Sequence, residues 1–342
     1  MTENKKRNLK LDNMKFLLIF LVVLGHISEK YTEDYTGFKI IFLTIYVFHM
    51  PAFLYISGML SKSTIDKRKY RNIFSYLILY FFIKIFRNGV SFLVYGSGSF
   101  SLLSESGLAW YAGALFAYCL MTMMAGKADK RWLLACSVIL GCFAGYDGEL
   151  GDFLILSRII VYYPFFLLGY MTDINSIMKY ARKASLKVLS AAGIAAFLAV
   201  FAVYGEKLYW IRPLLTGRNP FSELEFFSEY GLVLRFMYYI AVMVIILMLI
   251  VLTPDVRILA ITGAGSRSIA TYALHFCLID VLWGVFGFGT WMQANAEGIY
   301  MYLGMAAIAF VIVMVTSLPI LAEMVKYLTT PKLATEVEEK NG

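Results

Sequence analysis

A lysine and a histidine stand eleven residues apart in the apolar segment LDNMKFLLIFLVVLGHISEK, residues 11–30. Eleven residues of α-helix make about three turns and about 16 Å of rise, so Lys15 and His26 project from nearly the same face. One end of that face then carries a fixed cation, and the other carries an imidazole, which gains or loses a proton near neutral pH. The pair therefore indicates chemistry that links the two ends of the segment.

All three histidines and five of the basic residues fall inside apolar runs. The basic residues are Lys15, Lys84, Arg87, Arg158 and Arg235. A charge deep in a bilayer costs about 2.5–3.5 kcal/mol, so several together indicate an internal polar site. Snorkelling from a span end is an alternative for Lys15, Arg158 and Arg235. It is harder to invoke for Lys84 and Arg87, which lie near the middle of their run.

The second histidine lies beside a proline in FHMPAFLYISGMLSK, residues 48–62. Pro51 lacks an amide donor and frees a helix carbonyl that needs a partner, and His49 stands just before it. Ser57 and Gly58 allow a close approach between helices. The segment is therefore either a packing helix whose histidine satisfies a carbonyl, or part of a polar pocket.

The third histidine lies in GSRSIATYALHFCLI, residues 265–279. Helical spacing places Ser268, Tyr272 and His275 on one stripe. Core packing with a hydrogen bond and a role in a catalytic pocket are equally open for His275.

Two arginines follow the second apolar run, in DKRKYRNIFSY, residues 66–76. Arg68 and Arg71 are three residues apart, so they are neighbours on one helical face, and paired guanidinium groups can bind phosphate oxygens. The alternative is the ordinary excess of basic residues on the cytoplasmic side of a membrane protein.

The elements that must position these residues are membrane helices. Hydrophobic residues make up 60% of the 342 residues and charged residues 16%, and the mean hydropathy is +0.70. These values, with long apolar runs between short polar connections, predict an all-α polytopic bundle of about ten transmembrane helices. We expect one integral-membrane domain over residues 1–342, with an uncleaved first helix and a tail at 322–342. The predicted spans are 12–28, 38–60, 73–95, 108–125, 132–146, 156–172, 186–204, 232–253, 267–286 and 299–321.

The distribution of charge predicts the orientation. Of the 31 Lys and Arg residues, 21 lie in one alternate set of connections and five in the other. The positive-inside rule therefore places both termini in the cytoplasm. The net charge of +8 is mainly a topology signal and argues against nucleic-acid binding. The longest outer connection, 205–231, is expected to be an aromatic belt or a lid. The four cysteines have no metal or redox spacing, and no metal is expected.

Several segments, in order along nearly the whole chain, resemble the motifs of the acyltransferase-3 superfamily of multi-pass membrane acyltransferases. Lys15 and His26 match its basic residue, ten intervening residues and histidine, and Arg68 to Arg71 match its RxxR motif. The other matching segments are FHMPAFLYISGML (48–60), LAWYAGALFAY (108–118), YYPFFLLGY (162–170) and SIATYALH (268–275).

The resemblance implies transfer of an acyl group, usually acetyl from acetyl-coenzyme A, to a hydroxyl of a glycan or lipid-linked sugar, in the plasma membrane. It implies that His26 is the general base or a transient acyl carrier, that Lys15 is a second catalytic residue, and that Arg68 and Arg71 bind the phosphates of a cytoplasmic donor. By their positions, Lys15, Arg87 and Tyr272 are candidates to stabilise the oxyanion. The predicted pocket residues are His49, Ser57, Lys84, Arg87, Trp110, Arg158, Tyr272 and His275.

Two other functions fit the same residues. A transporter or flippase could bind an anionic substrate with its intramembrane cations. Such a protein is expected to have paired broken helices, and only Pro51 and Pro164 suggest any. A non-catalytic scaffold or sensor is the third reading.

Overall fold

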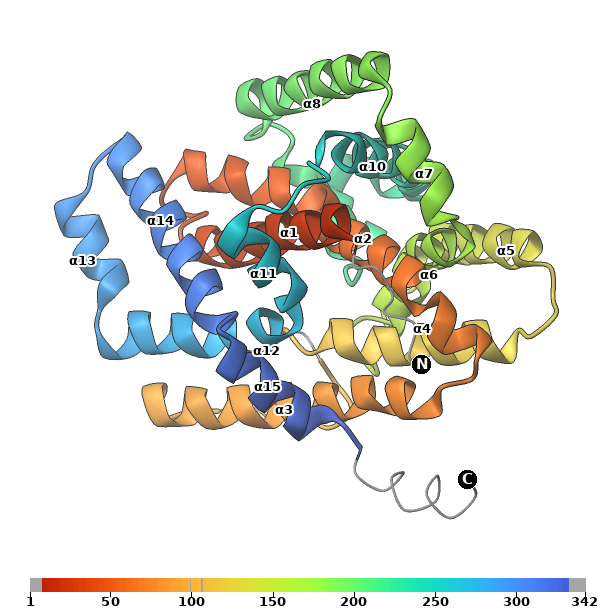
Figure 1. The fold of residues 1–342 in the computed structure, drawn as a ribbon. Helices are drawn as coiled ribbons and strands as arrows, with labels where there is room; N and C mark the ends of the chain where they lie inside the picture. Colours follow the sequence, from red (N-terminus) through yellow and green to blue (C-terminus); the bar gives the residue numbers. More distant parts are fainter. Residues whose placement is uncertain (1–7, 99, 106, 332–342) are drawn as a thin grey trace.

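The computed structural model describes residues 8–98, 100–105 and 107–331, and within them the chain is all-α (Figure 1). The one β contact in this part is an isolated bridge between Ser104 and Phe153. The helices are α1 (Leu9–Glu29), α2 (Thr36–Asp66), α3 (Tyr70–Tyr95), α4 (Trp110–Met124), α5 (Lys130–Phe143), α6 (Leu156–Met171), α7 (Ile174–Ala181), α8 (Ala184–Tyr204), α9 (Arg212–Thr216), α10 (Gly231–Leu252), α11 (Leu259–Ser266), α12 (Ser268–Asp280), α13 (Phe288–Asn295), α14 (Ile299–Thr316) and α15 (Pro319–Thr329). Shorter helical turns are η1 (Ala144–Tyr146), η2 (Tyr209–Ile211), η3 (Phe221–Tyr230) and the π-helical η4 (Val281–Val285).

Each of the ten predicted spans overlaps one or two of these helices, and the chain is a multi-pass membrane protein. Seven helical segments are long and apolar enough to cross a bilayer, and α4 and α6 are shorter apolar helices. The seven are α1, α2, α3, α8, α10 with η3, α12 with η4, and α14. The fifth predicted span corresponds to α5, which has only 14 residues. The count of ten crossings therefore stays a prediction.

The short helices α7, α11, α13 and α15 were not predicted. The predicted tail at 322–342 begins inside α15, and the predicted last span at 299–321 is two helices that break before Pro319. Proline cannot donate the hydrogen bond that would continue α14, but it suits the first turn of α15. Residues 1–7 and 332–342 lie outside the described residues, so the cytoplasmic placement of both termini stays a prediction.

The two helices that carry His26 and His49 are the most enclosed. In the most apolar window of α1 and of α2, 67% of the residues are buried, compared with 17% for α3 and 11% for α8. Figure 1 shows α1 and α2 in the middle of the bundle and α3 and α8 at opposite edges. Exposed apolar side chains on the edge helices, such as Leu93 and Val203, suit contact with lipid tails. Polar residues in the middle of these helices, such as His49, are correspondingly kept inside the protein.

Two glycines allow α2 and α6 to touch along their backbones. A Cβ atom added at Gly58 of α2 would collide with the carbonyl oxygen of Phe166, and one added at Gly169 of α6 would collide with that of Tyr55. Small residues give this close approach in membrane helices, where packing replaces the hydrophobic effect as the driving force. The approach fixes α2, and with it His49, against α6.

The N-terminal end of α1, which is the end away from His26, is held by hydrogen bonds to the end of α10 and to the connection between α10 and α11. The Lys10 ammonium donates to the carbonyls of Ile250, Val251 and Thr253 at the end of α10, where carbonyls lack partners within their helix. The Asn13 amide donates to the carbonyls of Pro254 at 3.0 Å and Val256 at 2.8 Å. These contacts fix the position of α1 along its own axis, and α1 is the helix that carries His26.

Candidate active site

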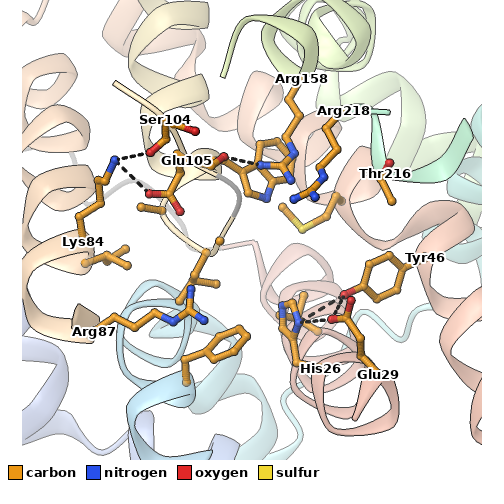
Figure 2. Close-up of a pocket in the computed structure, with 18 of the residues that line it drawn as sticks. His26, Glu29, Tyr46, Lys84, Arg87, Ser104, Glu105, Arg158, Thr216 and Arg218 are labelled. Carbon is orange, nitrogen blue, oxygen red and sulfur yellow. Dashed lines mark hydrogen bonds and ion pairs between the residues drawn. The ribbon is translucent and has the colours of Figure 1, made fainter. Parts of the chain in front are cut away.

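A cavity of about 920 Å³ lies at the ends of the helices that the charge distribution predicts to face outward. Side chains of α1, α2, α3, α6 and α12 line it, together with the connections before α4 and around α9 (Figure 2). The sequence-predicted site residues that line it are His26, His49, Lys84, Arg87, Trp110, Arg158 and Tyr272. The cavity therefore gathers residues from the first to the last third of the chain.

One ring nitrogen of His26 is held by two neighbours. Its Nδ1 lies 3.3 Å from the Tyr46 hydroxyl and 3.5 Å from Oε2 of Glu29. The Tyr46 hydroxyl donates to the same Glu29 oxygen at 3.1 Å (Figure 2). With the Nδ1 proton directed at the carboxylate, Nε2 keeps a free lone pair. Since Nε2 has no hydrogen-bond partner among the described residues, it is available to a molecule in the cavity.

The Glu29 carboxylate connects His26 to the outer connection. Its second oxygen, Oε1, lies 3.6 Å from Nη2 of Arg212 at the start of α9. The two oxygens thus serve different partners, one on α1 and α2 and one on the segment at 205–231. That segment lines the cavity with Arg212, Thr216 and Arg218, among others. It is therefore part of the site, in addition to any contact with the membrane interface.

The other two histidines gather around the first. The His275 ring stacks on His26 at 5.6 Å between centroids, and the His49 ring lies 4.8 Å from Tyr46. His49 Nδ1 bonds the carbonyl of Ile45 at 2.8 Å, and His275 Nδ1 bonds that of Thr271 at 2.8 Å. Because a carbonyl only accepts, each Nδ1 carries a proton and each Nε2 is free to be an acceptor. His49 lines the cavity, whereas His275 is fully buried behind His26.

Lys84 is a buried cation with a complete set of partners. Its ammonium lies 3.3 Å from Oε2 of Glu105 and donates to the Tyr80 hydroxyl at 3.1 Å and the Ser104 carbonyl at 2.9 Å. These contacts tie α3 to the connection that precedes α4. Lys84 therefore shapes the wall of the cavity more than it offers a free charge.

Arg158 and Trp110 form the opposite wall. The Arg158 guanidinium donates to the carbonyl of Glu105 at 3.0 Å, lies 3.7 Å from Asp152, and lies 5.1 Å from the centre of the Trp110 ring. Trp110 in turn stacks on Tyr162 at 5.5 Å. Arg158 is buried, so it does not snorkel from the end of α6.

Arg235, the last basic residue inside a predicted span, is fully buried but does not line the cavity. It donates to the carbonyl of Leu214 at 2.5 Å and lies against the rings of Phe221 and Tyr238. Through these contacts Arg235 holds the connection at 205–231 in place. Because its side chain is fully buried, the alternative that it snorkels to the membrane surface is wrong, as it is for Arg158.

Tyr272 fixes the start of α4. Its hydroxyl donates to the carbonyl of Leu108 at 2.6 Å and accepts from the amide of Ala112 at 3.3 Å. The single hydroxyl proton is therefore already used, and an oxyanion role would require breaking the bond to Leu108. Tyr272 is better described as a positioning residue for Trp110.

Five residues from the sequence-derived site lie away from the cavity lining, namely His275, which is buried behind His26, and four others. Lys15 pairs with Asp12 of its own helix at 2.8 Å. The Ser57 hydroxyl is 2.7 Å from that of Tyr111. Arg68 and Arg71 are exposed where α2 meets α3, at the end predicted to be cytoplasmic. Arg68 lies in the turn between the two helices with a φ of 47°, so the prediction that the two arginines share a helical face is wrong. Their roles toward a donor stay predictions.

The sequence interpretation missed Glu29, Tyr46, Glu105, Arg212 and Arg218. Glu29 had a local signal, since it is three residues after His26 and shares its helical face. The other four lie on different elements, and no spacing along the chain indicates that they belong to the site.

Comparison with known families decides what kind of protein carries this site. The family model described as an acyltransferase domain, acyltransferase-3, matches residues 8–322. The chain belongs to the acyltransferase-3 family. This membership agrees with the motifs found in the sequence.

One curated relative of this acyltransferase-3 protein is the nodulation protein NolL of Sinorhizobium fredii (strain NGR234). It is 27% identical over 183 residues, which cover 48% of this chain and 48% of the relative. The aligned part thus spans about half the length of each protein. No solved structure gives a significant match.

Proposed function

We propose that this acyltransferase-3 protein moves an acyl group, acetyl in the first instance, from a cytoplasmic acyl-coenzyme A to a hydroxyl of a cell-surface or envelope glycan or of a lipid-linked sugar. The membrane is the plasma membrane. The observation that carries the proposal is His26, whose Nδ1 is held by Glu29 and Tyr46 while its ring lines the cavity.

In the general-base form of the reaction, the acceptor hydroxyl donates to Nε2 of His26. As the hydroxyl oxygen attacks the thioester carbonyl, His26 takes its proton, the carbon–sulfur bond breaks, and the thiolate of coenzyme A leaves. The imidazolium, stabilised by Glu29, then returns the proton to the thiolate. Base catalysis of this kind contributes about 10²–10⁴-fold in rate.

In the alternative form, Nε2 attacks the thioester carbonyl, the carbon–sulfur bond breaks, and the thiolate of coenzyme A leaves. The acceptor hydroxyl then attacks the acyl-imidazole, the carbon–nitrogen bond breaks, and the hydroxyl proton passes to the thiolate. The same geometry serves both forms, because both need a free Nε2 lone pair. An acyl-imidazole is cleaved by hydroxylamine, so rapid quenching of the protein with labelled donor and no acceptor separates the two. Label on the protein that His26→Gln abolishes and hydroxylamine removes identifies the acyl carrier.

The two substrates would approach His26 from opposite ends of α1. Arg68 and Arg71 lie at the end predicted to be cytoplasmic, where their guanidinium groups are exposed and suit the phosphates of coenzyme A. Lys15 lies about 16 Å of helix below His26. The extended pantetheine arm would cover that distance, and the acceptor would enter through the outward-facing cavity.

The proposal is tested with the full-length protein in nanodiscs and labelled acetyl-coenzyme A. Wild type is expected to consume the thioester and acetylate saccharide acceptors, and His26→Ala and His26→Gln to lose at least 100-fold of that rate. Cys136→Ser, at an exposed position outside the cavity lining, is the control. Movement of a labelled glycan across the bilayer without any thioester consumption would instead favour the transporter.

A further inference from the structure

The charges that line the cavity do not balance. It is lined by three carboxylates, Glu29, Glu105 and Glu223, and by six cationic side chains. The cations are Lys30, Lys84, Arg87, Arg158, Arg212 and Arg218. A site built for a neutral saccharide has no need of this excess, because an unpaired charge in a partly enclosed site is unfavourable.

Most of the charged groups find partners within the protein. Glu29 pairs with Arg212, and Glu105 pairs with Lys84. Asp152, just behind the lining, serves both Arg158 at 3.7 Å and Arg218 at 3.3 Å.

Three lining charges stay outside these pairs. Glu223 is exposed and accepts a hydrogen bond from the Asn219 amide at 2.5 Å. Lys30 is exposed, where water solvates it. Arg87 is the exception, since it is only partly exposed and has no carboxylate within 4 Å and no hydrogen bond among the described residues. The buried Asp280 at the end of α12 acts on it only through longer-range electrostatics.

The placement of Arg87 directs its guanidinium into the cavity. The group lies 4.3 Å from the centre of the Phe276 ring, and His26 lies 4.6 Å from the same ring. The two groups are thus separated by at most the sum of these distances, about 9 Å. Figure 2 shows Arg87 between the Lys84–Glu105 pair and His26, with no interaction drawn to it. A sugar whose hydroxyl contacts His26 can therefore place a second group at Arg87.

Gly107 allows the Arg87 guanidinium to lie against the connection before α4. A Cβ atom added there would collide with Nη1 of Arg87. The guanidinium is a planar fork of donors that matches a carboxylate or phosphate in two parallel hydrogen bonds. A guanidinium that lines the cavity, lies over the Phe276 ring and makes no direct ion pair favours an anionic partner from outside the protein.

We infer that the acceptor saccharide carries a negatively charged group, a carboxylate or a phosphate, and that Arg87 binds this group while His26 engages the hydroxyl. The inference rests on the proposed function for its reaction, but the recognition of the anion is a separate property. It also differs from an oxyanion role for Arg87, which would act on every acceptor alike.

The test compares matched acceptors with the full-length protein in nanodiscs. The probes are methyl glucoside, methyl glucuronoside and methyl glucoside 6-phosphate, with labelled acetyl-coenzyme A as donor. For wild type, kcat/KM is expected to be higher for at least one anionic probe than for the neutral one. The better anionic probe distinguishes a carboxylate from a phosphate.

The deciding quantity is the ratio of kcat/KM for the anionic probe to that for the neutral probe. Arg87→Gln is expected to lower this ratio about 10- to 100-fold, as expected for loss of a charged hydrogen-bonded contact. Arg87→Lys keeps the positive charge but lacks the planar guanidinium donors, so it should retain part of the wild-type preference for the anionic probe. The control is Lys207→Gln, which removes a positive charge from the connection at 205–231 at a position outside the cavity lining. This variant should leave the ratio unchanged.

An unchanged ratio in Arg87→Gln, or a wild type without anionic preference, overturns the inference.

Calorimetric binding of methyl glucuronoside and of methyl glucoside 6-phosphate, each compared with methyl glucoside, gives a second readout that needs no turnover. If acetyl-coenzyme A is never consumed, the proposed function fails. Selective binding of an anionic probe that Arg87→Gln abolishes would then still support anion recognition, and equal binding of all three probes would refute it. A thermal unfolding curve in detergent confirms that each variant is folded.

Discussion

At the scale of single residues, the site depends on how Nδ1 of His26 is held. Glu29 and Tyr46 both contact that nitrogen and also contact each other. Misplacing a catalytic group by about 1 Å can cost about 100-fold in rate. We therefore expect Glu29→Gln to lower kcat about 10- to 100-fold and Tyr46→Phe to lower it less, with KM for the donor nearly unchanged.

The two substitutions should also be non-additive, because both act on one nitrogen. Steady-state kinetics of the single and double variants measure this coupling. Independent effects that simply multiply would contradict a shared role in orienting His26.

Gly107 gives a second prediction at this scale. Because a Cβ atom at this position would collide with the Arg87 guanidinium, Gly107→Ala should displace it. We expect the anionic-to-neutral ratio of kcat/KM to fall in the same direction as in Arg87→Gln. A normal ratio in a folded Gly107→Ala protein would mean that Arg87 binds equally well from another position.

At the scale of helices, the contact between α2 and α6 should not tolerate even one methyl group at Gly58. A Cβ there would meet backbone, which cannot move aside as a flexible side chain can. Overpacking typically costs about 1–3 kcal/mol, so Gly58→Ala should lower the midpoint of thermal unfolding in detergent. Gly89→Ala in α3 is the matched control, because nothing lies within 4 Å of its added Cβ. Equal midpoints for the two variants would contradict direct backbone contact.

At the scale of the whole molecule, the orientation of the bundle decides which substrate enters the cavity. The positive-inside rule predicts that the cavity end, with Lys207, faces outward and that the α2–α3 connection, with Lys69, faces the cytoplasm. After replacement of the native cysteines, Lys207→Cys should react with an impermeant maleimide in intact cells. Lys69→Cys should react only after permeabilisation. The reverse pattern would place the acceptor cavity in the cytoplasm.

The sequence by itself determined the class of fold and the approximate position of the main helices. Both depend on local properties, since an apolar run near the length of a bilayer crossing must satisfy its own backbone and becomes a helix. The motifs of the first, second and later runs likewise identified the family, which the family match over residues 8–322 confirms. The short helices α7, α11, α13 and α15 were missed because they lie in connections whose apolar runs are brief.

Only the tertiary structure decided which charges remain free. Lys84 and Arg87 lie three residues apart on α3, yet one meets Glu105 and the other meets no carboxylate among the described residues. Arg158 looked capable of reaching water, but it is buried against Trp110. Periodicity along a helix determines which residues share a face, whereas their partners come from other helices, whose lateral packing depends on contacts such as those of Gly58. For that reason the sequence could place His26 and Arg87 within spans, but only the fold could bring both against one ring, that of Phe276.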